Sequence, residues 1–198
     1  MILIIIGPPA SGKGTQAELI SKKFKLKHIS TGDLSRKINS EEIVKYLSTG
    51  KLVPDEFIFN ILKKEISDIR DFILDGYPRT LNQAKLFNRY LEERKLSIDK
   101  VIYIKVSDET IIKRIVSRRI CEKCGKVYST LTYDKSVCEC GGKLIQRSDD
   151  TEDVAKNRLE VFKRQTEPII NLYRDKVIEV DGEKNINDIF EQICKMLK

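Results

Sequence analysis

The segment Gly7–Thr15 constrains this chain more than any other. It follows a fully apolar run, Ile2–Ile6, typical of a central strand buried on both faces, and it precedes a helical pattern that continues to about Phe24. A glycine-rich loop in this setting turns backbone N–H groups toward a polyphosphate, and a lysine such as Lys13 adds a point charge for the outer phosphates. The sequence therefore predicts a nucleotide-binding loop and not an ordinary strand–turn–helix connection.

The rest of the chain alternates strand-like and helix-like segments. Short apolar runs bounded by turn or charged residues predict strands at Phe72–Asp75, Val101–Val106 and Val177–Val180, with a shorter one at His28–Ile29. Helical patterns cover about residues 54–67, 80–95, 108–119, 151–175 and 186–198. This alternation is typical of an α/β fold in which helices flank a parallel sheet.

Two stretches interrupt the alternation. Residues 30–53 predict a small helical insert, and residues 117–150, which lack helical periodicity, predict a small β-rich insert. The core is expected to comprise residues 1–29, 54–116 and 151–198. Cys194 falls within the apolar stripe of the last helical pattern, so it is interpreted as a buried hydrophobic side chain and not as a reactive thiol.

Composition and charge restrict the function classes. The 198 residues are 40% hydrophobic, enough for one folded domain, and no apolar run approaches the roughly 18 residues of a membrane span. Met1 leads directly into a strand without the basic region of a signal peptide, so a soluble, cytoplasmic protein is expected. Lys and Arg outnumber Asp and Glu by 37 to 30, and a net charge of +7 indicates an anionic partner: nucleic acid, a membrane surface or small phosphorylated ligands.

Four of the five cysteines form two close pairs, Cys121-x2-Cys124-Gly and Cys138-x-Cys140-Gly. Two such knuckles are typical of tetrahedral thiolate coordination of Zn²⁺ with no open position for catalysis. The alternatives are disulfides, which a cytoplasmic setting disfavours, and a metal-free remnant of such a site. We predict a structural zinc ion held by these four cysteines.

An ordered series of motifs makes the chain resemble the adenylate kinases, a family of nucleoside monophosphate kinases. In the loop, Gly14 follows Lys13 where the common phosphate-loop pattern has Ser or Thr, and this Gly-Lys-Gly-Thr variant is similar to that of the family. The other motifs cover essentially the whole chain and are Ser30–Leu34 with Arg36, Gly50–Val53, Asp75–Thr80 with Gln83, Arg114, Arg118–Arg119, Arg147–Asp150 and Arg158. Three features depart from the family pattern: the insert between Arg36 and Gly50 is shorter, Ala10 replaces a glycine, and the second cysteine pair is spaced Cys-x-Cys where the family's lids usually have Cys-x2-Cys.

The resemblance implies a phosphate-loop NTPase-like core that transfers the γ-phosphoryl group of ATP·Mg²⁺ reversibly to AMP, with residues 30–53 as the NMP-binding insert and 117–150 as a zinc lid. The implied ATP-binding residues are Ala10, Ser11, Gly12, Lys13, Gly14, Thr15, Arg114, Arg118, Val127, Tyr128 and Lys184. The implied AMP-binding residues are Thr31, Arg36, Lys51, Leu52, Val53, Gly76, Tyr77, Pro78, Arg79, Gln83, Arg147 and Arg158. The implied catalytic residues are Lys13, Arg79, Arg118, Arg147 and Arg158. A monomer that binds neither nucleic acid nor membrane is expected.

The residues themselves support parts of this assignment. Catalysis of phosphoryl transfer is mostly positioning and electrostatic stabilisation by cations. We expect the two anionic substrates, and not protein carboxylates, to neutralise the lysine and arginine residues of the motifs. Arg114 and Arg118 lie four residues apart, which predicts that they share a helix face and address one ligand. The Gln83 amide can pair with an adenine edge. Asp75, at the end of a buried strand, either holds hydrated Mg²⁺ or caps the next turn.

The sequence leaves alternatives open for the acceptor substrate and for the class of protein. The single histidine, His28, lies in a strand-like segment and is a poor general base, which favours an acceptor that is already anionic, such as a phosphate. A kinase acting on UMP, CMP or GMP is one alternative. Another is a nucleic-acid-binding protein with a zinc ribbon and ATP as a switch, although residues 121–140 carry only Tyr128 and Tyr133 as stacking aromatics.

Overall fold

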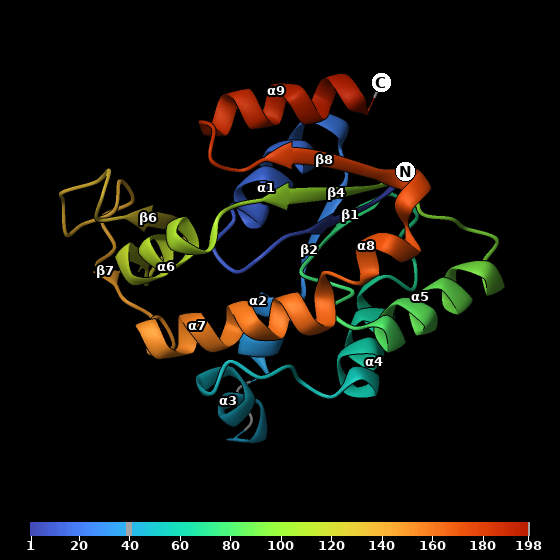
Figure 1. The fold of residues 1–198 in the computed structure, drawn as a ribbon, viewed down its shortest axis with the longest axis horizontal. Helices are drawn as coiled ribbons and strands as arrows, with labels where there is room; N and C mark the ends of the chain where they lie inside the picture. Colours follow the sequence, from blue (N-terminus) through green and yellow to red (C-terminus); the bar gives the residue numbers. More distant parts are fainter. Residues whose placement is uncertain (39–40, 198) are drawn as a thin grey trace.

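A computed structural model of the chain describes residues 1–38 and 41–197. Its main feature is a sheet of five parallel strands in the order β2-β3-β1-β4-β8 (Figure 1). The strands are β1 (Ile2–Ile6), β2 (Lys27–Ser30), β3 (Phe72–Asp75), β4 (Lys100–Lys105) and β8 (Val177–Asp181). The predicted α/β fold class and all five predicted strands are confirmed, and no strand end moves by more than one residue.

Helices surround this sheet. They are α1 (Lys13–Phe24), α2 (Thr31–Lys37), α3 (Glu41–Ser48), α4 (Asp55–Glu65), α5 (Leu81–Glu93), α6 (Asp108–Ser117), α7 (Glu152–Val161), α8 (Ile169–Leu172) and α9 (Ile186–Met196). Within residues 1–38 and 41–197, no helix combines the length and the apolar composition needed to cross a membrane.

The side chains of β1 divide the core into two layers. Ile2, Ile4 and Ile6 pack with α4, α5 and α8 on one face of the sheet. Leu3 and Ile5 pack with α1 and α9 on the other face, and Figure 1 shows α9 on the opposite side of the sheet from α4 and α5. Because helices cover both faces, every residue of β1 is buried, which explains its uninterrupted apolar sequence.

The sheet register places one edge of the fold for binding. Asp75, the last residue of β3, lies opposite Ser30 of β2 and Ile5 of β1. The carboxyl ends of these parallel strands therefore meet at one edge, where α1 and α2 also begin. In open α/β sheets, ligands bind outside this edge.

The two inserted stretches have the predicted secondary structure. The first contains α2 and α3, and Ser30 caps α2 by accepting a hydrogen bond from the N–H of Asp33 at 3.3 Å. Residues 39–40 of this stretch lie outside the described residues. The second contains a separate antiparallel sheet in the order β6-β5-β7, which Figure 1 shows beyond the end of α6. Its strands are β5 (Arg118–Cys121), β6 (Val127–Ser129) and β7 (Leu144–Ile145).

The prediction of one continuous helix over residues 151–175 is wrong. α7 ends at Val161 and continues as a π-helical turn over Phe162–Thr166, before the short α8 and a 3₁₀ turn over Arg174–Lys176. Pro168 is the physical reason, because it lacks the N–H that would continue the α-helical ladder. The N–H of Glu167 instead donates to the carbonyl of Phe162, five residues earlier, at 2.9 Å.

Candidate functional site

The predicted phosphate loop, Gly7–Thr15, connects the end of β1 to the start of α1. Gly12 precedes the helix with a φ of 96° and provides no side-chain cap for its first turn. The uncapped N–H groups of a helix start carry the positive end of the helix dipole, which attracts an anion. Ser11 is 1% exposed, and its Oγ atom has no hydrogen-bond partner among the described residues. A buried hydroxyl without a partner beside such a helix start fits a phosphate group.

Lys13 and Asp75 are electrostatic partners next to this loop. The Lys13 ammonium donates to the carbonyl of Pro8 at 2.7 Å. Burial lowers the pKa of Lys13 to about 8; Asp75 opposes this shift, and two neighbouring arginines reinforce it. A Cβ atom on Gly14 would lie 3.3 Å from Asp75 Oδ2, which gives a physical reason for glycine where the common pattern has Ser or Thr. His28 Nε2 lies 3.7 Å from the same oxygen.

Five arginines form the arginine cluster of the site: Arg36, Arg79, Arg118, Arg147 and Arg158. Burial lowers the pKa of Arg79; Asp75 opposes this shift, while Arg36 and Arg158 add to it. Burial likewise lowers the pKa of Arg147 to about 10, and Arg36 and Arg118 lower it further. Arg147 Nε is buried and has no hydrogen-bond partner within the described part of the chain. Mutually repelling cations with an unpaired buried N–H favour an anionic ligand.

The expectation that these cations lack protein carboxylates is wrong for three of them. The ion pairs are Arg36–Asp33, Arg118–Asp150 and Arg158–Asp149. Asp150 is completely buried, and Arg118 Nε donates to its Oδ2 at 2.8 Å. For the nearly buried Arg118 and Arg158, a guanidinium without a counter-charge has a large desolvation cost, and the carboxylates offset this cost. Among the described residues, Arg79 and Arg147 have no carboxylate within salt-bridge distance.

The prediction that Arg114 and Arg118 share a helix face is also wrong. α6 ends at Ser117, and Arg118 has an extended backbone, with φ −65° and ψ 137°, as the first residue of β5. Arg114 Nη2 donates to the carbonyl of Gly182 at 2.9 Å. It therefore lies against the turn after β8, which also carries the exposed Lys184, whereas Arg118 is engaged with Asp150.

The turn after β3 links the sheet edge to α2 and α5. Thr31 Oγ1 donates to the carbonyl of Gly76 at 2.8 Å, and Arg79 Nε donates to the same carbonyl at 2.6 Å. Between Gly76 and Arg79 lie the buried Tyr77 and Pro78, joined by a cis peptide bond. The next helix, α5, is capped by Thr80 through the N–H of Gln83, so Asp75 does not serve as its cap.

Gln83 is 2% exposed, and both ends of its amide bond to protein atoms. Nε2 donates to Asp55 Oδ1 at 2.8 Å, and Oε1 accepts from the backbone N–H of Arg79 at 2.7 Å. Asp55 was not predicted as a site residue, because 28 residues separate it from Gln83 and no local pattern connects them.

The remaining predicted residues lie on the two inserted stretches. Lys51, Leu52 and Val53 follow the turn at Gly50, where a Cβ atom would lie 3.0 Å from Arg158 Cγ, so this segment passes beside α7. Val127 and Tyr128 lie on β6, where they pair with Ile120 and Arg119 of β5. Arg118 is the first residue of β5, so the small sheet brings Arg118, Val127 and Tyr128 into one region.

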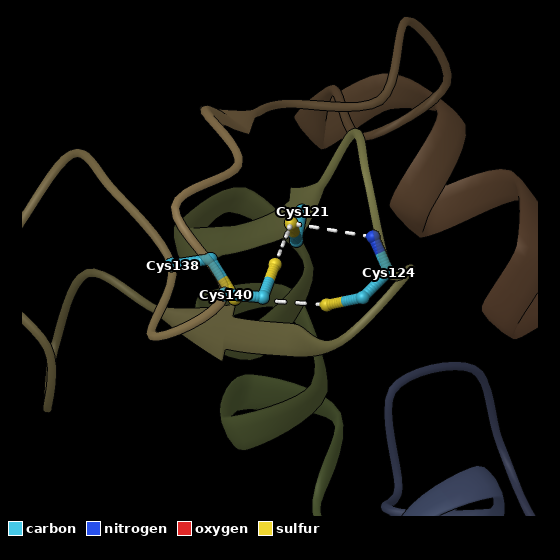
Figure 2. Close-up of side chains that lie close together, drawn as sticks. All are labelled: Cys121, Cys124, Cys138 and Cys140. Carbon is cyan, nitrogen blue, oxygen red and sulfur yellow. Dashed lines mark hydrogen bonds between the residues drawn. The ribbon is translucent and has the colours of Figure 1, made fainter.

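The four cysteines of the small sheet converge on one point (Figure 2). The sulfur atoms of Cys121, Cys124, Cys138 and Cys140 all lie within 4.8 Å of one another. The separations are 3.5 Å between Cys121 and Cys140 and 3.6 Å between Cys124 and Cys138. Four thiolates bound to zinc at about 2.3 Å would lie about 3.8 Å apart, so this arrangement fits a tetrahedral Zn²⁺ site. All four are free thiols, so the disulfide alternative finds no support here.

The two knuckles close in the same way despite their different spacing. The N–H of Gly125 donates to the carbonyl of Cys121 at 2.9 Å, and the N–H of Gly141 donates to that of Cys138 at 2.8 Å. The second turn is one residue tighter, as the shorter spacing predicts. A Cβ atom on Gly142 would lie 2.5 Å from Cys121 Sγ, so this position requires glycine to let the two knuckles approach.

Comparison with known proteins gives a consistent result. A sequence model described as adenylate kinase matches residues 5–178. Proteins named adenylate kinase from Petrotoga mobilis and Clostridium perfringens (strain SM101) are each 42% identical to the chain, covering all of it and 98% of their own length. The chain belongs to the adenylate kinase family. A protein named adenylate kinase from Methanothrix thermoacetophila is also 42% identical, over the whole chain.

The match to the adenylate kinase family extends over the residues that carry the motifs. The matched range, residues 5–178, includes the loop from Gly7 onward, the arginine cluster and the cysteine knuckles. Family membership also agrees with the observed fold, a parallel sheet flanked by helices with a phosphate loop after its central strand.

Proposed function

We propose that the protein transfers the γ-phosphoryl group of ATP reversibly to AMP, giving two ADP. The observation that carries the proposal is the arginine cluster beside the phosphate loop, in which Arg79 and Arg147 lack carboxylate partners among the described residues and Arg147 Nε lacks any hydrogen-bond partner there. Two phosphorylated substrates would supply the missing negative charge. The similarity to proteins named adenylate kinase supports AMP as the acceptor.

The donor site in this proposal is formed by the loop and the start of α1. Gly12 and the first N–H groups of α1 hold the ATP phosphates, and Lys13 exchanges its bond to Pro8 for the outer phosphates. The loop residues Ala10, Ser11, Gly14 and Thr15 surround the same phosphates, while Arg114, Val127, Tyr128 and Lys184 contact the rest of ATP. Magnesium neutralises phosphate charge during transfer, and Asp75, beside Gly14, is the carboxylate that would hold it through water.

The acceptor site lies between α2, the turn after β3 and the start of α5. Arg36 and Arg79 meet beside Gly32, where a Cβ atom would lie 3.2 Å from the Arg36 guanidinium and 3.6 Å from that of Arg79. A guanidinium binds a phosphate through two parallel hydrogen bonds. Thr31, Lys51, Leu52, Val53 and Gln83 contact the nucleoside, and Arg147 and Arg158 lie between the phosphates of the two substrates. In this proposal the catalytic residues are Lys13, Arg79, Arg118, Arg147 and Arg158.

The division of the chain follows from these roles. Residues 30–53 cover the acceptor and residues 117–150 cover the donor, while the remaining segments form the core. Zinc in the cysteine cluster would replace the hydrophobic core that so short a segment cannot build, and it would take no part in the chemistry. We place this enzyme in the cytoplasm as a monomer.

A coupled assay of ADP formation tests the proposal. The protein is supplied with ATP·Mg²⁺ and, in turn, with AMP, UMP, CMP and GMP. We expect the highest kcat/KM with AMP and ADP formation without AMP to be far slower. A higher kcat/KM with UMP, CMP or GMP would assign the protein to another acceptor, and ADP formation equally fast without any monophosphate would identify an ATPase.

A further inference from the structure

The amide group of Gln83 is held in one orientation by two partners of opposite kind. Asp55 faces Nε2 with a carboxylate, which accepts hydrogen bonds and donates none. The backbone N–H of Arg79 faces Oε1 and donates only. If the amide turned by 180°, its oxygen would face a carboxylate oxygen and its NH₂ group would face an N–H. Both hydrogen bonds would then be lost, and because Gln83 is only 2% exposed, water would not replace them.

The fixed orientation decides what Gln83 can offer a ligand. A glutamine amide has two donor hydrogens and two acceptor lone pairs. Among the described residues each end of the side-chain amide has one partner, so one hydrogen on Nε2 and one lone pair on Oε1 remain. An adenine ring presents an acceptor at N1 and a donor at its 6-amino group. A 6-oxopurine presents the opposite pair, a donor at N1 and an acceptor at O6, which an amide satisfies only after turning over.

We propose that Asp55 is a positioning residue that sets the base preference of the acceptor site, because it fixes the Gln83 amide in the orientation that pairs with a 6-aminopurine. This inference rests on the proposed function, since it requires that the acceptor base meets Gln83. Asp55 comes from the first turn of α4 and Gln83 from the first turn of α5, so the selectivity depends on how these two helices pack.

Asp55 also has contacts that serve only to brace the two helices. Its Oδ2 accepts from Thr80 Oγ1 at 2.9 Å and from Asn82 Nδ2 at 3.0 Å. A purely structural role would therefore weaken binding of every acceptor alike when Asp55 is changed. A role through Gln83 predicts a change in the ratio of kcat/KM between acceptors with different bases. This ratio therefore separates the two roles.

The experiment compares kcat/KM for AMP and for inosine monophosphate, which differ mainly in the two groups on this edge of the base. We expect wild type to prefer AMP strongly and Asp55→Ala to reduce this preference at least tenfold, with the KM for ATP unchanged. Asp55→Asn, which can still present a carbonyl oxygen to Nε2, should retain most of the preference. Asn82→Ala is the matched control, because it removes a partner of the same carboxylate without touching Gln83, and it should leave the ratio unchanged.

Three results would overturn the inference. One is an equal loss of kcat/KM for both nucleotides in Asp55→Ala, and another is a wild-type ratio near one. The third is an effect of Asp55→Ala on the ratio that persists in a Gln83→Leu background, since Asp55 must act through Gln83. If Asp55→Ala does not fold, Asp55→Leu fills the space without accepting a hydrogen bond and replaces it. Wild type without any AMP activity would overturn the proposed function, and this inference with it.

Discussion

Replacing Asp150 by alanine should destabilise the protein strongly. The Asp150 carboxylate is 0% exposed and accepts two hydrogen bonds from the Arg118 guanidinium. A second guanidinium nitrogen, from Arg158, lies 3.8 Å from it. Removing the carboxylate leaves Arg118, which is 14% exposed, as a nearly buried charge without this partner. Arg147, an electrostatic neighbour of Arg118, would then repel it with only Asp149 left as a carboxylate near both arginines.

The size of the effect follows from these contacts. Breaking a buried ion pair by removing one partner costs about 3–5 kcal/mol. The small exposure of Arg118 allows some hydration, so we expect the lower end of this range, about 3 kcal/mol. For a chain of this size, each kcal/mol lowers the melting temperature by about 2–4 °C, which predicts a decrease of about 6–12 °C.

Thermal unfolding followed by circular dichroism measures this decrease. The matched control is the double variant Arg118→Met/Asp150→Leu, which removes both charges and should regain most of the lost stability. Because Arg118 and Asp150 lie at the two ends of the 118–150 segment, amide hydrogen exchange in β5 and β6 should increase in the single variant. A decrease below about 2 °C, or a double variant no more stable than the single one, would refute the reasoning.

Four further predictions follow from the site. Arg79→Ala should lower kcat about a hundredfold to a thousandfold with little change in melting temperature, because it removes a transition-state contact of about 3–4 kcal/mol. Activity within threefold of wild type would show that Arg79 makes no such contact. Burial lowers the pKa of Lys13 to about 8, so its ammonium group loses its proton as the pH rises through 8. The Kd for ATP, measured by calorimetry, should therefore increase above pH 8 in wild type and change less with pH in Lys13→Arg. Identical pH profiles of the two proteins would contradict this prediction. Ala10→Gly should raise the free energy of unfolding by up to about 1 kcal/mol, because Ala10 has a φ of 55° at a cost of about 1–2 kcal/mol while its partly buried methyl group contributes at most about 0.8 kcal/mol. A lower melting temperature would argue against the strain. Protein purified without chelator should contain about one zinc per chain, and chelation should increase hydrogen exchange in β5–β7 while the core stays folded; a zinc content near zero would exclude the metal site.

The sequence by itself predicted features whose cause is local. The apolar run Ile2–Ile6 requires burial on both faces, so it identified the central strand wherever the rest of the chain lies. The loop Gly7–Thr15 and the two cysteine knuckles are encoded by residues within a few positions of one another. Their turns form through hydrogen bonds between near neighbours, such as that from Gly125 to Cys121. The tighter second knuckle was predictable for the same reason.

The tertiary structure decided features that depend on contacts between distant residues. Arg118 pairs with Asp150, 32 positions away, and Gln83 bonds to Asp55, 28 positions away. No local pattern encodes such pairs, because they depend on how helices pack on the sheet and where each strand ends. The helix prediction for 108–119 failed at Arg118 for this reason, since pairing with Ser129 in the small sheet draws that residue out of the helix. The sequence alone therefore predicts which cations belong to the site, whereas only packing determines that protein carboxylates already neutralise Arg118 and Arg158.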